Sequence, residues 1–449
     1  MTKRKFFGTD GIRGRANTKN MTAELAITLG MAAGSYFQKN SSHKKVVIAK
    51  DTRLSGYLLE PALTAGFIAV GMDVILVGPM PTPAVAMLTS SMRADLGVML
   101  SASHNPHYDN GIKLFNPQGN KLCDKAELEI ERLMQVDPDS LRVDAADLGR
   151  ATRIEDASGR YIELIKRTFP TYLRLDGLRI VLDCANGAAY RVAPIILQEL
   201  GAEVVTLNDK PDGFNINRDC GSTHPEHLIE TVKAYRADAG IALDGDADRI
   251  VMCDEHGALL DGDQILAMVA VFMKSRNTLT NNKVVATHMS NLAFEHYLKE
   301  KDIEVIRTNV GDRYVIAGMK EHGSNLGGEQ SGHIVFSDYS TTGDGLLAGL
   351  QMLAVMQDKQ QPLSECAKAY TPYPQLLTNI RISPDTEPME APAVKQEIAK
   401  ATKDIGDTGR IYIRKSGTEP LLRIMVESKD EHQVRKVSKS IAHVIKKAI

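Results

Sequence analysis

Three aspartates alternate within a short stretch in the middle of the chain, "LDGDADRIVM" at 243–252, where they are Asp244, Asp246 and Asp248. Carboxylates this close repel one another unless a cation offsets their charge, and oxygen-only ligands suit a hard cation such as Mg²⁺. Three ligands are too few to fill its coordination shell, so an anion such as a phosphate is expected to complete it. A solvated acidic turn is the alternative interpretation of the same residues.

The same stretch resembles a calcium-binding EF-hand loop in part of its spacing. Glu255 falls at the twelfth position, where such a loop has a glutamate. The sixth position, however, is Arg249, and an EF-hand needs glycine there for its turn. The flanking runs "GIAL" and "IVMC" also read as strands rather than helices, so an EF-hand is rejected.

A second polar stretch, "SASHNPHYDNG" at 101–111, follows the apolar run "DLGVML". A serine is a weak nucleophile without a base or a metal. Ser103 has His104 beside it, but neighbours on an extended strand point to opposite faces, which argues against a Ser–His relay. The Gly-x-Ser-x-Gly elbow is also missing. Two interpretations remain, an ordinary turn and a serine that carries phosphate, and spacing alone does not distinguish Ser101 from Ser103.

A third stretch, "IRKSGTEPLLRI" at 413–424, combines hydroxyls, a glycine and basic side chains. Exposed backbone N–H groups and guanidinium groups together suit a phosphate monoester. The Walker A spacing is absent, and an ordinary basic turn remains the alternative. The residues concerned are Arg414, Lys415, Ser416, Gly417, Thr418 and Arg423.

Two further stretches carry weaker signals. In "LGGEQSGHIVF" at 326–336, Glu329, Ser331 and His333 alternate, and a carboxylate and a hydroxyl facing one side suit sugar hydroxyls. A lone histidine such as His333 is equally well explained as a structural residue. In "GTDGIRGRA" at 8–16, Arg13 lies in a glycine-rich opening loop without the spacing of a dinucleotide site.

The elements that must position these residues form a repeat. The order strand, loop, helix, strand occurs around "KVVIAKD" (45–51), again over 178–208, and again over 282–309. This order is typical of βαβ units whose helices cover a mixed or parallel sheet. Three copies predict three related α/β domains. After the proline-containing linker "TPYPQ" (371–375), the pattern changes to that of a smaller α+β domain.

The predicted architecture is therefore α/β, with three related α/β domains with mixed or parallel sheets and a smaller C-terminal α+β domain. The predicted domains are 1–150 with the serine loop, 151–258 with the aspartate loop, 259–372 with the Glu329 loop, and 373–449 with the basic loop.

Composition excludes several classes of protein. The formal net charge of -2 gives no polybasic signal for nucleic acid or an anionic membrane. The most apolar stretch, 65–80, is interrupted by Asp73 and is too short to span a bilayer, and no signal-peptide core follows the basic start. Five scattered cysteines without a Cys-x-x-Cys pair argue against disulfides or a zinc site and predict a cytoplasmic location.

The motifs "SASHNP", "DGDADR", "GEQSGH" and "RKSGTEPLLR" occur in the order found in the α-D-phosphohexomutase family, and the whole chain resembles the four-domain layout of that family. The resemblance implies an active site in the central cleft. Within the family, "TDGIRG", "VGDRYV" (310–315) and Gln330 resemble the branch that acts on glucosamine phosphates. The mannose- and glucose-phosphate mutases of the family are the alternative, and a metal-dependent sugar phosphatase is a more distant one.

The resemblance implies a role for each motif. Ser103 matches the phosphoserine, and its phosphate completes a Mg²⁺ site with Asp244, Asp246 and Asp248. The residues assigned to the reacting group are Ser103, His104, Lys113, Arg249, Arg13 and His333; those assigned to substrate binding are Glu329, Ser331, Arg414, Ser416, Gly417, Thr418 and Arg423.

The implied reaction interconverts glucosamine 6-phosphate and glucosamine 1-phosphate through a 1,6-bisphosphate, and supplies UDP-N-acetylglucosamine and cell-wall precursor synthesis. The implied cofactors are Mg²⁺, phosphorylated Ser103, and glucosamine or glucose 1,6-bisphosphate as activator. The expected partner is a small hexosamine phosphate, with no nucleic acid or membrane, and a homo-oligomer is left open. Lys113, His104 and His333 are unranked candidates for the general base.

Overall fold

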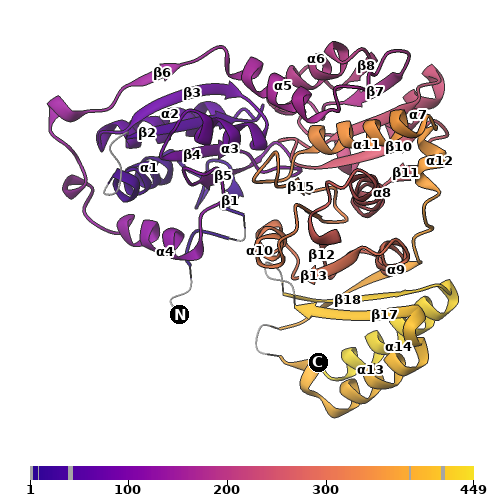
Figure 1. Cartoon of the computed structure of the whole chain (residues 1–449). Coiled ribbons are helices and arrows are strands. Elements are labelled where there is room, and N and C mark those ends of the chain that lie inside the picture. Colours follow the sequence, from indigo (N-terminus) through magenta and orange to yellow (C-terminus); the bar gives the residue numbers. More distant parts are fainter. Residues whose placement is uncertain (1–3, 9, 39–43, 384–385, 416–419) are drawn as a thin grey trace.

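The computed structural model of the chain describes residues 4–8, 10–38, 44–383, 386–415 and 420–449. Four sheets follow one another along the sequence, and the last of them stands apart below the third (Figure 1). None of the helices in these ranges combines the length and the apolar character needed to cross a membrane.

The first sheet has the strand order β1-β5-β4-β2-β3-β6, with β2 parallel to β3 and β4 and with β5 antiparallel to β4. Alternate side chains of β2 serve opposite faces: Val46 and Ile48 face α1, α2 and α4, whereas Val47 faces α3. The elements are β1 Ile12–Arg15, α1 Ala23–Gln38, β2 Lys45–Lys50, α2 Gly56–Ala69, β3 Asp73–Pro79, α3 Thr82–Ser91, β4 Leu96–Leu100, β5 Asp109–Phe115, α4 Asp124–Leu133 and β6 Ala151–Arg153.

The second sheet, with the order β11-β10-β9-β7-β8, contains a parallel core and an antiparallel hairpin of β9 and β10. This hairpin carries the aspartate loop. The elements are α5 Ala157–Thr168, β7 Arg179–Asp183, α6 Val192–Glu199, β8 Glu203–Leu207, α7 Glu226–Tyr235, β9 Ala239–Leu243, β10 Ile250–Asp254 and β11 Leu259–Leu260.

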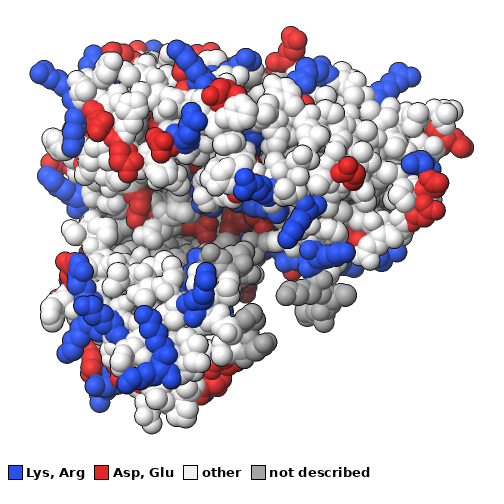
Figure 2. Space-filling view, turned by 180° about the vertical axis from the view of Figure 1, so that it is seen from behind, with Lys and Arg blue, Asp and Glu red and all other residues white. Residues whose placement is uncertain are grey.

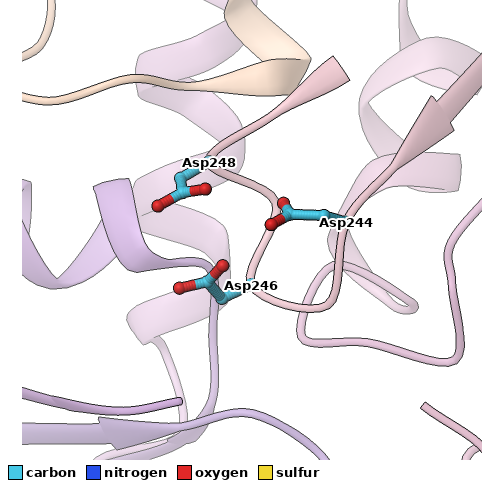
Figure 3. A group of neighbouring side chains, drawn as sticks. All are labelled: Asp244, Asp246 and Asp248. Atoms are coloured by element: carbon cyan, nitrogen blue, oxygen red, sulfur yellow. The ribbon is translucent and has the colours of Figure 1, made fainter. Parts of the chain in front are cut away.

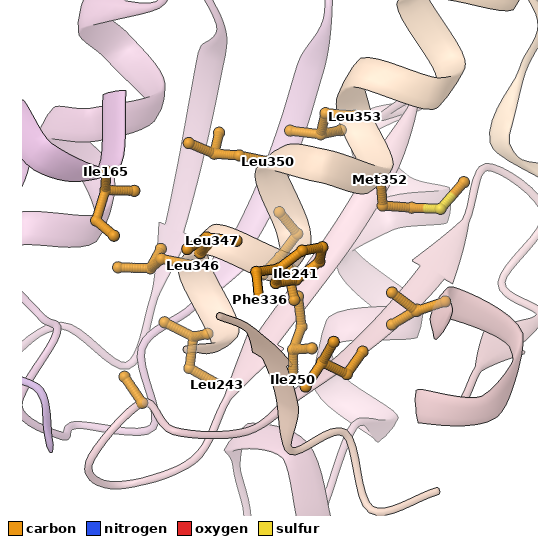
Figure 4. Packing of buried hydrophobic residues seen from close by; sticks show 14 of the residues in the cluster. Ile165, Ile241, Leu243, Ile250, Phe336, Leu346, Leu347, Leu350, Met352 and Leu353 are labelled. Carbon is orange, nitrogen blue, oxygen red and sulfur yellow. The ribbon is translucent and has the colours of Figure 1, made fainter. Parts of the chain in front are cut away.

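The third sheet has the order β13-β12-β14-β15, with β12 parallel to β13. The elements of this segment are α8 Gly262–Ser275, β12 Lys283–Thr287, α9 Leu292–Glu300, β13 Glu304–Thr308, α10 Asp312–His322, β14 Leu326–Gly328, β15 Ile334–Phe336, α11 Gly345–Lys359 and α12 Leu363–Ala367. Helix α11 packs against α5 and the β9–β10 hairpin as well as α8, so it closes the core of the preceding segment. Figure 4 shows Leu346, Leu347 and Leu350 of α11 in this shared core beside Ile241 and Ile250.

The fourth sheet is antiparallel, in the order β16-β18-β17, and α13 and α14 lie together on it (Figure 1). Its elements are β16 Gln375–Arg381, α13 Pro392–Ile405, β17 Gly409–Lys415, β18 Leu421–Ser428 and α14 Glu431–Lys447. It contacts the third segment through stacked His288 and Tyr412 rings and through Arg410, which donates to the Ser290 carbonyl at 2.9 Å.

The predicted fold class is confirmed, since three segments have mixed sheets with parallel βαβ pairs and the fourth is a smaller α+β unit. The three predicted repeats begin at β2, β7 and β12, each of which pairs in parallel with the strand after the next helix. Strand β6 belongs to the first sheet and β11 to the second, a few residues beyond the expected domain limits. The boundaries near 150, 258 and 372 remain proposals.

A buried carboxyl caps the shared core. Asp344 accepts hydrogen bonds from the Leu347 amide at 3.0 Å and the Tyr161 hydroxyl at 2.9 Å, and burial raises the pKa of Asp344 to about 6. An unfolded aspartate titrates near 3.9, so the stabilisation from neutral Asp344 is complete below about pH 4 and is lost as the pH rises through about 6.

The variant Asp344→Asn is therefore expected to gain stability relative to the wild type as the pH rises, because asparagine does not titrate. The relative gain between pH 4 and pH 7.5 should be about 3 kcal/mol of unfolding free energy. Chemical denaturation of both proteins at the two pH values measures it. A difference that does not change with pH would contradict a raised pKa at this position.

Candidate active site

The serine loop and the aspartate loop meet at the carboxyl ends of β4 and β9. Ser103 is buried and its Oγ donates to Asp244 Oδ2 at 2.5 Å. The two residues lie 141 positions apart in the sequence and come from different sheets. The contact thus joins the first two segments at the point where each strand ends.

Ser103 and His104 do not point to opposite faces, contrary to the expectation from an extended strand. Strand β4 ends at Leu100, and Ser103 has a left-handed backbone with φ of 53°. This turn brings the serine Oγ to within 3.3 Å of His104 Nδ1. Ser101, by contrast, supports the turn, since its Oγ accepts from the Ser103 amide at 2.9 Å.

A glycine permits the two loops to approach. A Cβ atom at Gly245 would lie 2.7 Å from the Ser103 carbonyl oxygen and 2.8 Å from Asn217 Nδ2. Both distances are shorter than van der Waals contact, so the serine loop lies directly against the glycine backbone. Close packing against the serine loop, as well as the turn itself, therefore favours glycine between Asp244 and Asp246.

The three aspartates converge on one point (Figure 3). One oxygen of each carboxylate lies within 4.8 Å of the others, and all three side chains are buried. Burial, followed by the charges of Asp248 and Asp246, raises the pKa of Asp244 well above its ordinary value. Oδ1 of Asp246 and Oδ1 of Asp248 have no hydrogen-bond partner within the described ranges. Burial of carboxylate oxygens without partners is unfavourable unless a cation binds them, so the residues fit a magnesium site.

Lys113 holds a proton rather than accepting one. Its Nζ donates to Asp246 Oδ2 at 2.7 Å and to Asp248 Oδ2 at 3.2 Å, and it lies 3.6 Å from Asp10. Burial opposes the charged form, but these three carboxylates outweigh it and raise the pKa of Lys113 well above its usual value. This arrangement makes Lys113 a poor general base.

The two histidines differ in the direction of their pKa shifts. Burial and the nearby Arg249 and Arg13 lower the pKa of His104 to about 4, so this ring is neutral at pH 7 and binds a proton weakly. For His333, burial opposes the charged ring, but Asp248 and Asp312 outweigh it and raise its pKa. The Gly343 amide donates to His333 Nε2 at 3.1 Å, which places the proton of the neutral ring on Nδ1.

One cleft of about 510 Å³ brings together side chains from all four segments. Figure 2 shows a hollow in the middle of one face, with acidic side chains inside it and basic ones at its edge. The sequence-predicted residues that line the cleft are Arg13, Asp248, Arg249, Glu329, His333, Arg414 and Arg423. Ser103 is buried and is not among the residues that line the cleft.

The loop after β14 presents Glu329 to the cleft. Glu329 Oε1 accepts from the Gly311 amide at 3.0 Å, so the start of α10 holds the carboxylate in place. Gln330 turns away and donates to Asp261 Oδ2 at 3.1 Å. Ser331 is exposed and is not among the residues that line the cleft.

The fourth sheet contributes two guanidinium groups. Arg414 of β17 and Arg423 of β18 are directly opposed in the antiparallel register, so their side chains share one face, and both line the cleft. Lys415 points elsewhere and pairs with Glu387 at 2.6 Å. The predicted Ser416, Gly417 and Thr418 lie outside the described residues.

Sequence reasoning missed a set of residues that links the first and third segments at the cleft. Lys121 forms ion pairs with Asp10 and with Asp312 of "VGDRYV". Thr82 was also missed, and its hydroxyl donates to Asp246 Oδ2 at 2.5 Å. Asp10 lies within "TDGIRG" and Asp312 within "VGDRYV", two motifs already identified from the sequence. Neither motif, however, shows which other segment its aspartate contacts.

Comparison with known proteins places the whole chain in one family. Four domains described as those of phosphoglucomutase/phosphomannomutase match consecutive segments: domain I at 4–139, domain II at 159–257, domain III at 261–373 and the C-terminal domain at 377–444. The chain belongs to the phosphoglucomutase/phosphomannomutase family. The predicted family is thereby confirmed.

Relatives within the phosphoglucomutase/phosphomannomutase family match over the full length. A protein named phosphoglucosamine mutase from Paramagnetospirillum magneticum is 58% identical over 447 residues, covering 99% of each chain. A phosphoglucosamine mutase from Caulobacter vibrioides is 57% identical over 449 residues, covering all of both.

Solved structures share the fold. A phosphoglucomutase/phosphomannomutase family protein from Burkholderia thailandensis superposes with a TM-score of 0.84 at 26% identity, covering 100% of this chain and 98% of the other. An N-acetylphosphoglucosamine mutase from Aspergillus fumigatus, solved with GlcNAc-6P and magnesium, has a TM-score of 0.67 at 19% identity and covers 99% and 96%. At that identity the second likeness concerns the fold alone.

Proposed function

We propose that this enzyme interconverts glucosamine 6-phosphate and glucosamine 1-phosphate. The observation that carries the proposal is the single cleft to which all four segments contribute, with Asp248, Arg414 and Arg423 in its lining and the buried Ser103–Asp244 contact next to Asp248. An enzyme that moves a phosphoryl group between two positions of one sugar needs a carrier for that group. It also needs a separate binding site for the phosphate that does not react. Full-length relatives named phosphoglucosamine mutase support the choice of sugar.

The proposed first step moves a phosphoryl group from phosphorylated Ser103 to the free hydroxyl of the sugar phosphate. The Oγ–P bond breaks, an O–P bond to the sugar forms, the hydroxyl proton passes to a base, and the released serine Oγ takes up a proton from that base. His104 is our choice of base because its ring is neutral and adjoins Ser103, whereas Lys113 is held protonated by its carboxylate neighbours. The product is a 1,6-bisphosphate, which turns over in the cleft.

The second step returns the other phosphoryl group to Ser103 and releases the isomeric monophosphate. Here the sugar O–P bond breaks, the Oγ–P bond forms again, and the Ser103 hydroxyl proton passes through the base to the sugar oxygen. Both steps need alignment and neutralisation of charge on the transferred group. Lys113 and Arg249, positioned around Asp248, are proposed to supply fixed positive charge for this neutralisation.

Asp244, Asp246 and Asp248 are proposed to hold Mg²⁺ together with an oxygen on Ser103. When bound, the ion supplies charge neutralisation for the phosphoryl oxygens. The aspartates themselves tie the two segments together, since Asp244 accepts from Ser103 of the serine loop and Asp246 accepts from Thr82 at the start of α3.

Substrate orientation is proposed to depend on contacts at both ends of the cleft. Glu329, held by the Gly311 amide, faces sugar hydroxyls that occupy similar places in the two orientations. Ser331 is proposed to join it when substrate is present. Ser416, Gly417 and Thr418, in the chain between β17 and β18, are proposed to bind the non-reacting phosphate with Arg414 and Arg423.

Replacing Arg414 by alanine is expected to raise the KM for the sugar phosphate by 10- to 100-fold and to lower kcat less. The reason is loss of a charge-assisted hydrogen bond to phosphate, worth about 1.5–3 kcal/mol. Steady-state kinetics measures the effect. Arg381→Ala is the matched control, because Arg381 is an exposed arginine on strand β16 of the same sheet and does not line the cleft. Equal changes in both variants would contradict a phosphate grip at Arg414.

The experiment that tests the proposed function compares glucosamine, glucose and mannose 6-phosphates with glucose 1,6-bisphosphate added as activator. We expect the highest kcat/KM on glucosamine 6-phosphate and no steady release of inorganic phosphate. Preference for mannose or glucose phosphate would assign the chain to another branch of the family, and steady phosphate release would indicate a phosphatase.

The cellular setting remains part of the proposal. All five cysteines are free, which suits a reducing cytoplasm, and glucosamine 1-phosphate would supply UDP-N-acetylglucosamine for cell-wall precursors.

A further inference from the structure

A fully buried arginine lies behind the serine loop, in "DTRLSG" after β2. Arg53 Nε donates to Asp51 Oδ2 at 2.8 Å, and the Arg53 side chain has no exposed surface. The two terminal nitrogens donate to four backbone carbonyls, those of Ser103, Asn105, Pro106 and Asp109. All five N–H groups of the guanidinium are therefore used, four of them on one loop.

The pattern of donors follows the shape of the loop. One terminal nitrogen, Nη2, contacts the Ser103 carbonyl at 2.9 Å and the Asn105 carbonyl at 2.8 Å. The other, Nη1, contacts the carbonyls of Pro106 and Asp109, the latter at 3.1 Å. Four carbonyls between residues 103 and 109 thus point toward the one rigid, planar guanidinium group of Arg53.

Asn217, from the second segment, completes the arrangement. Its Nδ2 donates to the Ser103 carbonyl at 2.8 Å and to the Asn105 carbonyl at 3.1 Å. Each of these two carbonyl oxygens therefore receives one donor from Arg53 and one from Asn217. A carbonyl with both donors satisfied has little freedom to rotate.

The backbone here needs such support. Ser103 has a backbone φ of 53°, a conformation that residues other than glycine rarely adopt. The loop around it, 101–108, lies outside any strand. Buried carbonyls without donors are unfavourable, so we expect the loop to rearrange if the donors are lost. The direction of the Ser103 side chain toward Asp244 follows from this backbone conformation.

We propose that Arg53 is a positioning residue, which acts with Asn217 to hold the Ser103 backbone so that the serine Oγ faces the aspartates. The inference rests on the proposed function, in which Ser103 carries the phosphoryl group. Arg53 does not line the cleft, so its loss should reduce the rate of transfer without weakening substrate binding.

A second cavity gives this proposal a specific test. A pocket of about 250 Å³ has Thr52, Arg53, Tyr57, Tyr190 and Pro211 in its lining. We expect removal of the Arg53 side chain to leave a space that opens into this pocket. A guanidinium ion added to the solution can then reach the four carbonyls.

The experiment uses the full chain with the variants Arg53→Ala, Arg53→Lys and Asn217→Gly. Glycine is chosen at 217 because that residue has a φ of 55°, which alanine would strain. The matched control is Glu60→Gln, which disturbs the buried Lys50–Glu60 pair at the same end of the sheet and contacts no carbonyl of the serine loop. The rate of Ser103 phosphorylation by glucose 1,6-bisphosphate is followed by intact mass, alongside kcat, KM and melting temperature.

We expect Arg53→Ala to lower kcat and the phosphorylation rate at least 100-fold with KM within about threefold, and Asn217→Gly to lower both rates about tenfold. Guanidinium at millimolar concentrations should restore part of the Arg53→Ala rate, whereas sodium chloride should not. Lysine at 53 should fall between alanine and the wild type. Glu60→Gln should lose stability but keep its kcat.

Two results would overturn the inference: Asn217→Gly with wild-type transfer rates, or Arg53→Ala with a rate loss no larger than that of a Glu60→Gln protein of equal melting temperature. If Arg53→Ala does not fold, Asn217→Gly alone decides. Absence of Ser103 phosphorylation in the wild type would instead contradict the proposed function, so the two failures are distinguishable.

Discussion

Replacement of Ser103 by alanine is expected to abolish mutase turnover, with a loss of at least 10⁴-fold, comparable to removal of a nucleophile in other covalent mechanisms. The reason is that the Ser103 hydroxyl contacts both Asp244 and His104, and its removal eliminates the proposed carrier of the phosphoryl group. Binding of glucosamine 6-phosphate should persist, because Glu329 and Arg414 come from other segments and do not depend on Ser103. Steady-state assays and equilibrium binding measure the two effects separately.

Ser101→Ala is the matched control for this prediction. Ser101 lies two residues away and its Oγ accepts from the Ser103 amide, so its loss should weaken the turn and lower the rate modestly. The phosphoryl group should still be found on Ser103. Retained mutase activity in Ser103→Ala, or a phosphopeptide centred on Ser101, would contradict the assignment of the carrier.

Replacement of Asp246 by alanine is expected to remove tight divalent-ion binding and to lower activity by more than 100-fold. Asp246 has a side-chain oxygen without a partner in the described structure, and it also holds Lys113 and Thr82. Its loss removes one of three carboxylates that a hard cation requires. Manganese binding, measured on the unphosphorylated protein by paramagnetic resonance, gives a readout besides activity.

Asp183→Asn serves as the control for the metal prediction. Asp183 is a buried carboxylate at the end of β7 that accepts from the Ala185 and Gly221 amides and does not line the cleft. The control should lose stability but keep its manganese affinity and its dependence on Mg²⁺. Asp246→Ala with wild-type activity at limiting Mg²⁺ would contradict the magnesium site.

The sequence allowed the fold to be predicted because local patterns decide it. Val46, Val47 and Ile48 alternate between two faces of one sheet, and each βαβ repeat carries its own strand and helix signals. The close approach of Asp244, Asp246 and Asp248 was also predictable, since three alternating residues in a tight turn must lie near one another.

The contacts between segments could not be predicted in the same way. The ion pair of Lys121 with Asp312 joins residues 191 positions apart, and no periodicity links them. The strand argument about Ser103 and His104 was wrong because it assumed an extended backbone where the chain turns through a left-handed residue. The five donors of Arg53 also depend on where a distant loop folds back, which a single sequence does not show.

The roles of Ser103, the aspartates and the arginines were inferred from a family resemblance, and the structure adds the physical reason for each proposed role. A turn, rather than a strand, directs the Ser103 hydroxyl toward Asp244. Carboxylates around Lys113 keep it protonated, which leaves neutral His104 as our preferred base. Opposed positions on β17 and β18 place Arg414 and Arg423 on one face of the fourth sheet.

The central claim is that Ser103 carries the phosphoryl group between the two positions of the sugar. The most direct test is a single-turnover reaction in which protein phosphorylated at Ser103 is mixed with glucosamine 6-phosphate and quenched at successive times. We predict that phosphate leaves the Ser103 peptide at the rate at which bisphosphate appears, and later returns as glucosamine 1-phosphate is released. Formation of glucosamine 1-phosphate while the Ser103 phosphate remains in place would contradict the claim.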